Sequence, residues 1–112
     1  MDRLDFFRQS IRHLLTEYAK LVTQNDGIEA QTIFDTEHDH YLLVHVGWRG
    51  NFQQIYGPAM HFDIKDGKVW VQYDSTDFDP VGELLEMGLK QDEIVLGFHA
   101  PYKRKHTGFA IA

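Results

Sequence analysis

The stretch His61-Phe-Asp-Ile-Lys-Asp-Gly-Lys-Val-Trp-Val-Gln-Tyr-Asp-Ser-Thr76 decides the fold, because it contains two alternating segments joined by Asp66-Gly67. A two-residue Asp-Gly connection favours a type I′ hairpin, in which both central residues take positive φ. The turn sets the register of both strands. The predicted pairs are Lys65 with Lys68, Ile64 with Val69, Asp63 with Trp70, Phe62 with Val71, His61 with Gln72, Met60 with Tyr73 and Ala59 with Asp74. One hairpin face is therefore apolar, and the other is polar around Trp70.

The size and charge of the chain limit its class. It has 112 residues, of which 43% are hydrophobic and 13% aromatic, so we expect a single domain over 1–112. The formal net charge of −6 argues against binding nucleic acid by broad phosphate neutralisation. The absence of cysteine excludes disulfides, thiolate zinc sites and cysteine nucleophiles. No segment has the length and apolarity of a membrane span or signal peptide, so we expect a soluble cytoplasmic protein.

Two helices are predicted. Asp2 can cap a helix that runs to about Thr23, along which apolar residues recur with a period near 3.6. The apolar positions are Leu4, Phe7, Ile11, Leu14, Leu15, Tyr18, Leu21 and Val22. Asp79-Pro80 starts a short second helix near 79–87, which Gly88 ends. We expect the long helix to cover one face of a sheet.

The remaining periodic segments predict strands. After a turn at Asn25-Asp26-Gly27, strands are expected at 28–35, 41–48, 53–65, 68–74 and 94–98. The segment 41–48 is apolar on both sides and is therefore expected at the centre of the sheet. Gly57-Pro58 predicts a bulge or an edge, because proline cannot donate to a β ladder. The fold class is α+β, with an antiparallel sheet of four to five strands packed on the long N-terminal helix.

Seven histidines raise the question of a metal site or an enzyme. His45, His61 and His99 lie on predicted β segments that could converge, and Asp63 and Gln72 share the polar hairpin face with His61. No activated nucleophile or phosphate-cradling loop accompanies them. We therefore expect no enzyme, no cofactor and no metal, with a metal-dependent enzyme using His61 and Asp63 as an alternative.

A surface for a protein partner is the preferred interpretation of the remaining features. Trp70 on the polar hairpin face either lies beneath another segment or anchors an interface. Lys103-Arg104-Lys105-His106 is the one dense basic run, and direct DNA contact through it is a further alternative. An open strand edge leaves homodimerisation as another. The candidate partner-binding residues are His61, Asp63, Trp70, Gln72, Lys103, Arg104 and Lys105.

The order of segments along the chain resembles one known family. The segments are an N-terminal helix, Glu29-x-Gln31-Thr32-Ile33-Phe34-Asp35, His40-Tyr-Leu-Leu-Val with Val46-Gly47-Trp48, His61-x-Asp63-Ile64-Lys-Asp-Gly-Lys-x-Trp70-x-Gln72-Tyr73-Asp74, and Ile94-Val-Leu-Gly-Phe98-His99-x-Pro101. Together, over essentially the whole chain, they resemble the XisI family. XisI proteins are small cyanobacterial factors that act with XisH and a site-specific recombinase to control the developmental, heterocyst-linked excision of the fdxN DNA element.

The resemblance implies a function that the residues alone do not reveal. It implies a non-enzymatic accessory factor that binds a XisH-like partner and acts on the recombinase only indirectly. Because XisH looks like a nuclease-fold protein, the alternative is an antitoxin-like or immunity-type protein whose acidic surface masks a basic nuclease. The resemblance brings no catalytic residues to this chain.

Overall fold

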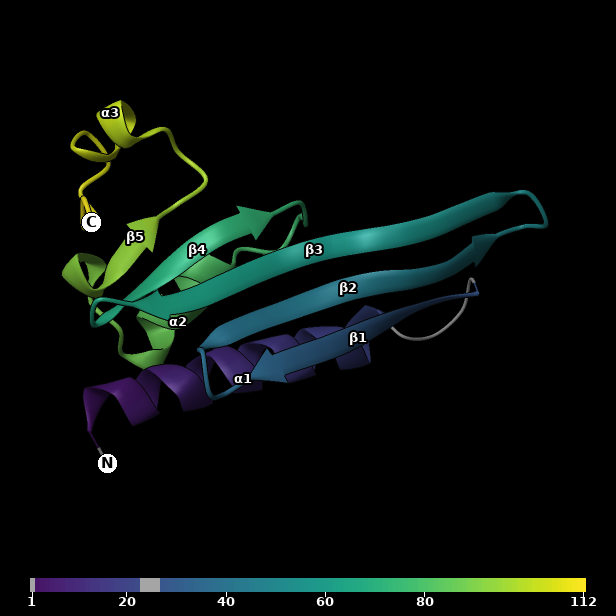
Figure 1. Cartoon of the computed structure of the whole chain (residues 1–112), viewed down its shortest axis with the longest axis horizontal. Helices are drawn as coiled ribbons and strands as arrows, with labels where there is room; N and C mark the ends of the chain where they lie inside the picture. Colours follow the sequence, from purple (N-terminus) through teal and green to yellow (C-terminus); the bar gives the residue numbers. More distant parts are fainter. Residues whose placement is uncertain (1, 23–26) are drawn as a thin grey trace.

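A computed structural model describes residues 2–22 and 27–112 and shows an α+β fold with an open five-stranded sheet (Figure 1). The predicted helix end at Thr23 and the turn residues Asn25 and Asp26 lie outside the described residues. Strand β1 spans Ile28–Asp35, β2 His40–Arg49, β3 Gln53–Lys65, β4 Lys68–Asp74 and β5 Ile94–Leu96. The α+β class and the five strands predicted from the sequence are confirmed.

Helix α1, Arg3–Val22, begins as the sequence predicts. The Asp2 carboxylate caps it by accepting a 2.8 Å hydrogen bond from the Asp5 backbone N–H. The buried face of the helix lies along its middle and comprises Phe7, Ser10, Ile11, Leu14 and Leu15. Leu21 belongs to the predicted apolar stripe but is 74% exposed.

The strand order is β1-β2-β3-β4-β5, and the first four strands pair antiparallel. Strand β5 joins β4 in parallel, which differs from the antiparallel arrangement expected for the whole sheet. A parallel neighbour needs a crossover connection, and helix α2, Pro80–Met87, followed by the 3₁₀ turn η1, Gln91–Glu93, supplies it. Asp79 caps α2 through the Gly82 N–H, and Gly88 ends it at φ 114°, as predicted.

The hairpin register is confirmed as far as the pair Phe62–Val71 and is wrong beyond it. A bulge lies there, so that His61 pairs with Tyr73 and Met60 with Asp74. Gln72, predicted to face His61, is therefore the extra residue of β4, and Ala59 now accepts a hydrogen bond from the Ser75 N–H. The turn chemistry sets the register only up to the first irregularity.

A second bulge interrupts the pairing of β2 with β3. Leu43 pairs with Met60 and Val44 with Pro58, so Ala59 is the extra residue. This confirms the bulge predicted at Gly57-Pro58, and it confirms β2 as an inner strand. The proline lies beyond the last residue of β3 that pairs with β4, where no ladder hydrogen bond is needed from it.

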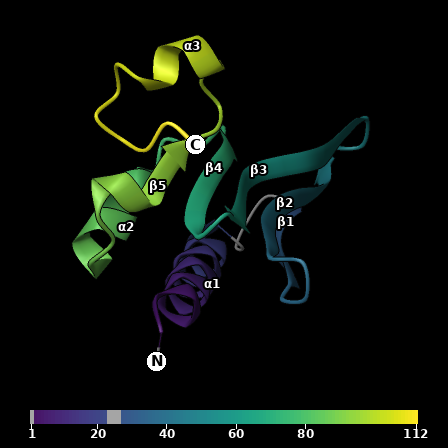
Figure 2. The same ribbon diagram turned by 60° about the vertical axis from the view of Figure 1, so that its left-hand side comes forward.

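Helices α1 and α2 pack on one face of the sheet, and the core lies between this helical layer and the sheet. The largest fully buried side chains include Tyr41, Phe7, Phe62 and Ile11, which come from both layers. Figure 2 shows α1 on one side of the sheet and the C-terminal segment with helix α3, Pro101–Arg104, on the other, next to β4 and β5. None of the described helices has the length and apolarity needed to cross a membrane.

The tip of the β2–β3 hairpin extends well beyond helix α1 (Figure 1). We call residues 47–56 the arm. Strand β3 pairs with β4 only from Met60 to Lys65, so its first half is paired on the β2 side alone within the described chain. The arm therefore carries a strand edge with free backbone groups, which another strand can use.

Candidate functional site

The face of β1, β2 and β3 opposite α1 is the candidate functional surface, and we call it the open face. Tyr41 and Leu43 of β2 are fully buried against the α1 layer, so the alternate residues of β2 point the other way. The strand register brings their cross-strand partners to the same side. The open face comprises Glu29, Gln31, Ile33, Asp35, His40, Leu42, Val44, Val46, Trp48, Gln54, Tyr56, Pro58, His61 and Asp63.

At one end of the open face, the Asp63 carboxylate is the centre of a hydrogen-bonded cluster. Its Oδ1 lies 2.7 Å from His40 Nδ1 and 2.8 Å from His61 Nε2. Its Oδ2 accepts a 3.1 Å hydrogen bond from the Gln72 amide. His40 is the cross-strand neighbour of Asp63, and the β4 bulge brings Gln72 to its other side. Three of the predicted site residues, His61, Asp63 and Gln72, are therefore brought together.

The cluster shifts the pKa values of two of its members. Burial alone would raise the pKa of Asp63, but the hydrogen bonds from His40, His61 and Gln72 outweigh it and hold that pKa below its ordinary value. The same carboxylate raises the pKa of His40, mainly through their hydrogen bond. The cluster is therefore built around an ionised carboxylate that stabilises positive charge on His40.

His40 is the member of this cluster that the sequence analysis missed. The sequence left open a convergence of His45, His61 and His99, but among the described residues the histidine and carboxylate atoms that gather are those of His40, His61 and Asp63. The available signal was register: from the pair Leu43–Met60, the ladder places His40 opposite Asp63. That pairing could not be counted from the β2–β3 turn, because the bulge at Ala59 intervenes.

Trp70 is buried and is not an exposed anchor, which corrects its place among the candidate partner-binding residues. Only 7% of it is exposed, and its indole N–H donates to the Lys65 carbonyl at 3.2 Å. The Lys65 ammonium lies 4.1 Å and the Arg104 guanidinium 5.2 Å from the centre of the ring system. Of the two alternatives for Trp70, burial beneath another part of the chain is therefore the one that holds.

The basic run occupies helix α3 and the residues after it. Arg104 covers Trp70 and donates to the His99 carbonyl at 3.1 Å, so it has a structural role. Lys103 and Lys105 are exposed, and the Lys103 ammonium lies 5.9 Å from the Tyr102 ring centre. Of the basic candidates, Lys103 and Lys105 are thus the ones whose side chains are free to meet a partner at the surface.

The arm exposes large apolar side chains that the sequence analysis did not select. Trp48 is 50%, Phe52 95% and Tyr56 75% exposed. Trp48 and Tyr56 lie on the open face, and Ile33, 49% exposed, lies on its β1 edge. The alternation in β2 gave the right faces, but apolar residues on both sides were interpreted as burial. Phe52 could have been found from length, because it lies in the turn of a hairpin that is longer than α1 can cover, whereas Trp48 and Tyr56 are exposed because they lie on the face opposite α1.

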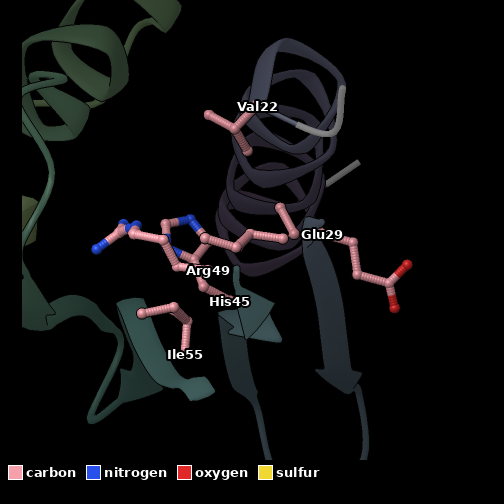
Figure 3. Close-up of a pocket in the computed structure, with 7 residues that line it drawn as sticks. Val22, Glu29, His45, Arg49 and Ile55 are labelled. Carbon is pink, nitrogen blue, oxygen red and sulfur yellow. The ribbon is translucent and has the colours of Figure 1, made fainter. Parts of the chain in front are cut away.

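Figure 3 shows a pocket of about 200 Å³ on the α1 side of the arm, between the end of α1 and strands β1 to β3. His45 lines it, and its Nε2 is buried with no hydrogen-bond partner among the described residues. The Glu29 carboxylate points away from the other labelled side chains (Figure 3).

Comparison with known proteins decides the family. The family model described as XisI protein matches residues 1–111. The chain belongs to the XisI family. The crystal structure of a XisI-like protein from Anabaena variabilis ATCC 29413 is similar to this XisI family member at a TM-score of 0.91 and 44% identity, covering 97% of this chain and 99% of that one.

A second crystal structure gives the same result. The fdxN element excision controlling factor XisI from Anabaena variabilis ATCC 29413 matches at a TM-score of 0.85 and 36% identity, covering 99% of this chain and 100% of that one. A search of curated proteins found no match. The two structural relatives confirm the family resemblance and agree with the fold of this XisI family member over nearly its full length.

Proposed function

We propose that this XisI family member is a non-enzymatic accessory factor in the controlled excision of a DNA element, and that it acts by binding a XisH-like partner protein. The name of the 36% identical relative, an fdxN element excision controlling factor, supports the excision role. The observation that carries partner binding is the open face, which exposes Trp48 and Tyr56 on a protruding hairpin.

Exposed aromatic side chains grouped on a rigid strand pair are typical of protein interfaces. Such residues supply large contact areas at small entropic cost, and they dominate binding free energies when a partner buries them. The free edge of β3 adds a second means of recognition, because a partner strand can pair with it. The net charge of −6 favours a partner with a basic surface.

Co-expression of this chain with the XisH-like protein of the same genome tests the proposal. Size-exclusion chromatography with light scattering should show one complex that contains both chains. The double variant Trp48→Ala/Tyr56→Ala should lose the complex while keeping its circular dichroism spectrum. Leu21→Ala is the matched control, because it removes an equally exposed apolar side chain from the helical layer. Separate elution at micromolar concentration, or equal loss in the control, would refute the proposal.

The antitoxin-like alternative predicts the same complex and differs in its consequence. The acidic net charge favours it, since a basic nuclease surface is the natural complement of an acidic protein. Adding this chain to the XisH-like protein in a DNA cleavage assay separates the two roles. Inhibition in proportion to complex formation supports the antitoxin-like role, whereas an unchanged cleavage rate supports the accessory factor.

A further inference from the structure

We propose that His40, His61 and Asp63 form a binding site for a first-row transition metal ion of the Zn²⁺ type on the open face of the sheet. This site is independent of the proposed partner binding and requires no catalytic activity. Its basis is a set of two imidazoles and one carboxylate whose ligand atoms all lie within 4.8 Å of one another. Two histidines with one carboxylate are a common ligand set for zinc and similar metals.

The sheet fixes the positions of the three ligands. His40 of β2 lies directly opposite Asp63 of β3, and His61 lies two residues before Asp63 on the same strand, hence on the same face. Bonds of about 2.0–2.1 Å to a tetrahedral zinc place ligand atoms roughly 3.3 Å apart. The His40–Asp63 and His61–Asp63 separations of 2.7 and 2.8 Å must therefore open by about half an ångström. The ligand atoms of His40 and His61, within 4.8 Å of each other, must instead draw closer by up to about 1.5 Å. Binding therefore requires both imidazoles to rotate toward a common centre.

The surroundings of the cluster suit a metal. Gln72 holds Asp63 Oδ2, which leaves Oδ1 between the two imidazoles as the ligand atom. Such an outer hydrogen bond orients a ligating carboxylate and raises metal affinity. The Asp63 side chain is 14% exposed, whereas those of His40 and His61 are 50% and 31% exposed. The buried carboxylate forms the floor of the site, and the fourth coordination position faces solvent, where water or a partner's side chain can bind.

The same three groups also satisfy one another by hydrogen bonds without a metal, so binding must be measured directly. The test uses the full chain, with any affinity tag removed, and titrates Co²⁺ and Zn²⁺ by visible absorbance and calorimetry. We expect one ion per chain and a tetrahedral Co²⁺ spectrum that Zn²⁺ abolishes by competition. Mg²⁺ should not compete, because it prefers an all-oxygen octahedral shell.

Variants assign the site. Asp63→Asn and His40→Gln, each close in shape to the natural residue, should each weaken Co²⁺ binding at least about tenfold, and Gln72→Ala should weaken it about tenfold. The control His106→Gln removes an exposed histidine of the C-terminal segment and should change nothing. Circular dichroism verifies the fold of each variant. Absence of a Co²⁺ spectrum in the folded natural chain, or equal loss in the control, would overturn the proposal, whatever the outcome with the partner.

Discussion

The role of Trp70 depends on the chain segment that covers it. On its own hairpin it is a large aromatic on a polar face. In the folded chain, Lys65 lies over one part of the ring system and Arg104, more than thirty residues later in the sequence, over another. The hydrogen bond to the Lys65 carbonyl holds the indole on its own hairpin, and the cation–π contact with Arg104 attaches the C-terminal segment to it.

The residue-scale prediction compares the two tryptophans. Trp70→Ala should lower the free energy of unfolding by about 3 kcal/mol, because it removes a buried aromatic and leaves a cavity. Trp48→Ala should change it by less than about 1 kcal/mol, since half of Trp48 is already exposed. Urea denaturation followed by circular dichroism measures both. A smaller loss for Trp70→Ala than for Trp48→Ala would contradict the burial of Trp70.

The local sequence predicted which residues lie on each face of the strands. It did not predict which chain segments cover those faces. Alternation correctly separated Asp63, Trp70 and His61 from the apolar side of the hairpin. It could not show that Arg104 lies over Trp70, because that contact depends on the path of the chain after β5. Likewise, His40 joins Asp63 only through a ladder that contains a bulge. Contacts that cross a bulge or a long connection are the ones that pattern reasoning missed.

At the scale of elements, the β1–β2–β3 unit depends on one close approach of two backbones. A Cβ at Gly47 would lie 2.0 Å from the Gly27 carbonyl oxygen, at the position where β1 meets the arm. Gly57 has nearly the same φ, 159° against 154°, but no atom within 4 Å of its Cβ position. An alanine at Gly57 would therefore introduce backbone strain alone, whereas an alanine at Gly47 would introduce both strain and steric overlap.

The element-scale prediction uses these glycines as a matched pair. Gly57→Ala should cost about 1–2 kcal/mol of stability through backbone strain alone. Gly47→Ala should cost more, and it should also break the pairing of β1 with the arm, because the new methyl group displaces the backbone at Gly27. Urea denaturation gives the stabilities, and amide hydrogen exchange of Ile28–Asp35 reports the pairing. Equal effects of the two substitutions would show that strain alone matters.

The sequence predicted the type of each element but not how the elements extend past and pair with one another. Five strands and two main helices were predicted at nearly the right residues, because the hydrophobic periods and turn residues were strong. The parallel pairing of β5 and the protrusion of the arm were not predicted. Both depend on how α1 and α2 pack on the sheet, and that is decided by the whole core.

An ion pair joins Arg3 and Glu93, two residues that are ninety positions apart in the sequence. Arg3, in the first turn of α1, donates from Nε to Glu93 Oε2 at 3.0 Å. Glu93 also accepts a 2.9 Å hydrogen bond from the Lys90 N–H and so stabilises the turn before β5. These bonds, first of all the one from Arg3, lower the pKa of Glu93 against the opposing effect of burial. The first turn of α1 is thereby attached to the 3₁₀ turn that precedes β5.

This pair predicts a pH dependence of stability with a defined sign. Because the folded pKa of Glu93 lies below its ordinary value of 4.5, the carboxylate stabilises the fold above that value and loses its effect as the pH falls through the lower, folded pKa. Glu93→Gln should therefore be less stable than the natural chain at about pH 7, and the difference should shrink as the pH falls below 4.5 and vanish once the pH is below the folded pKa of Glu93. Urea denaturation at a series of pH values measures it, with the exposed Glu86→Gln as control. A difference that persists unchanged in acid would mean that Glu93 acts through packing or neutral hydrogen bonds rather than through its charge.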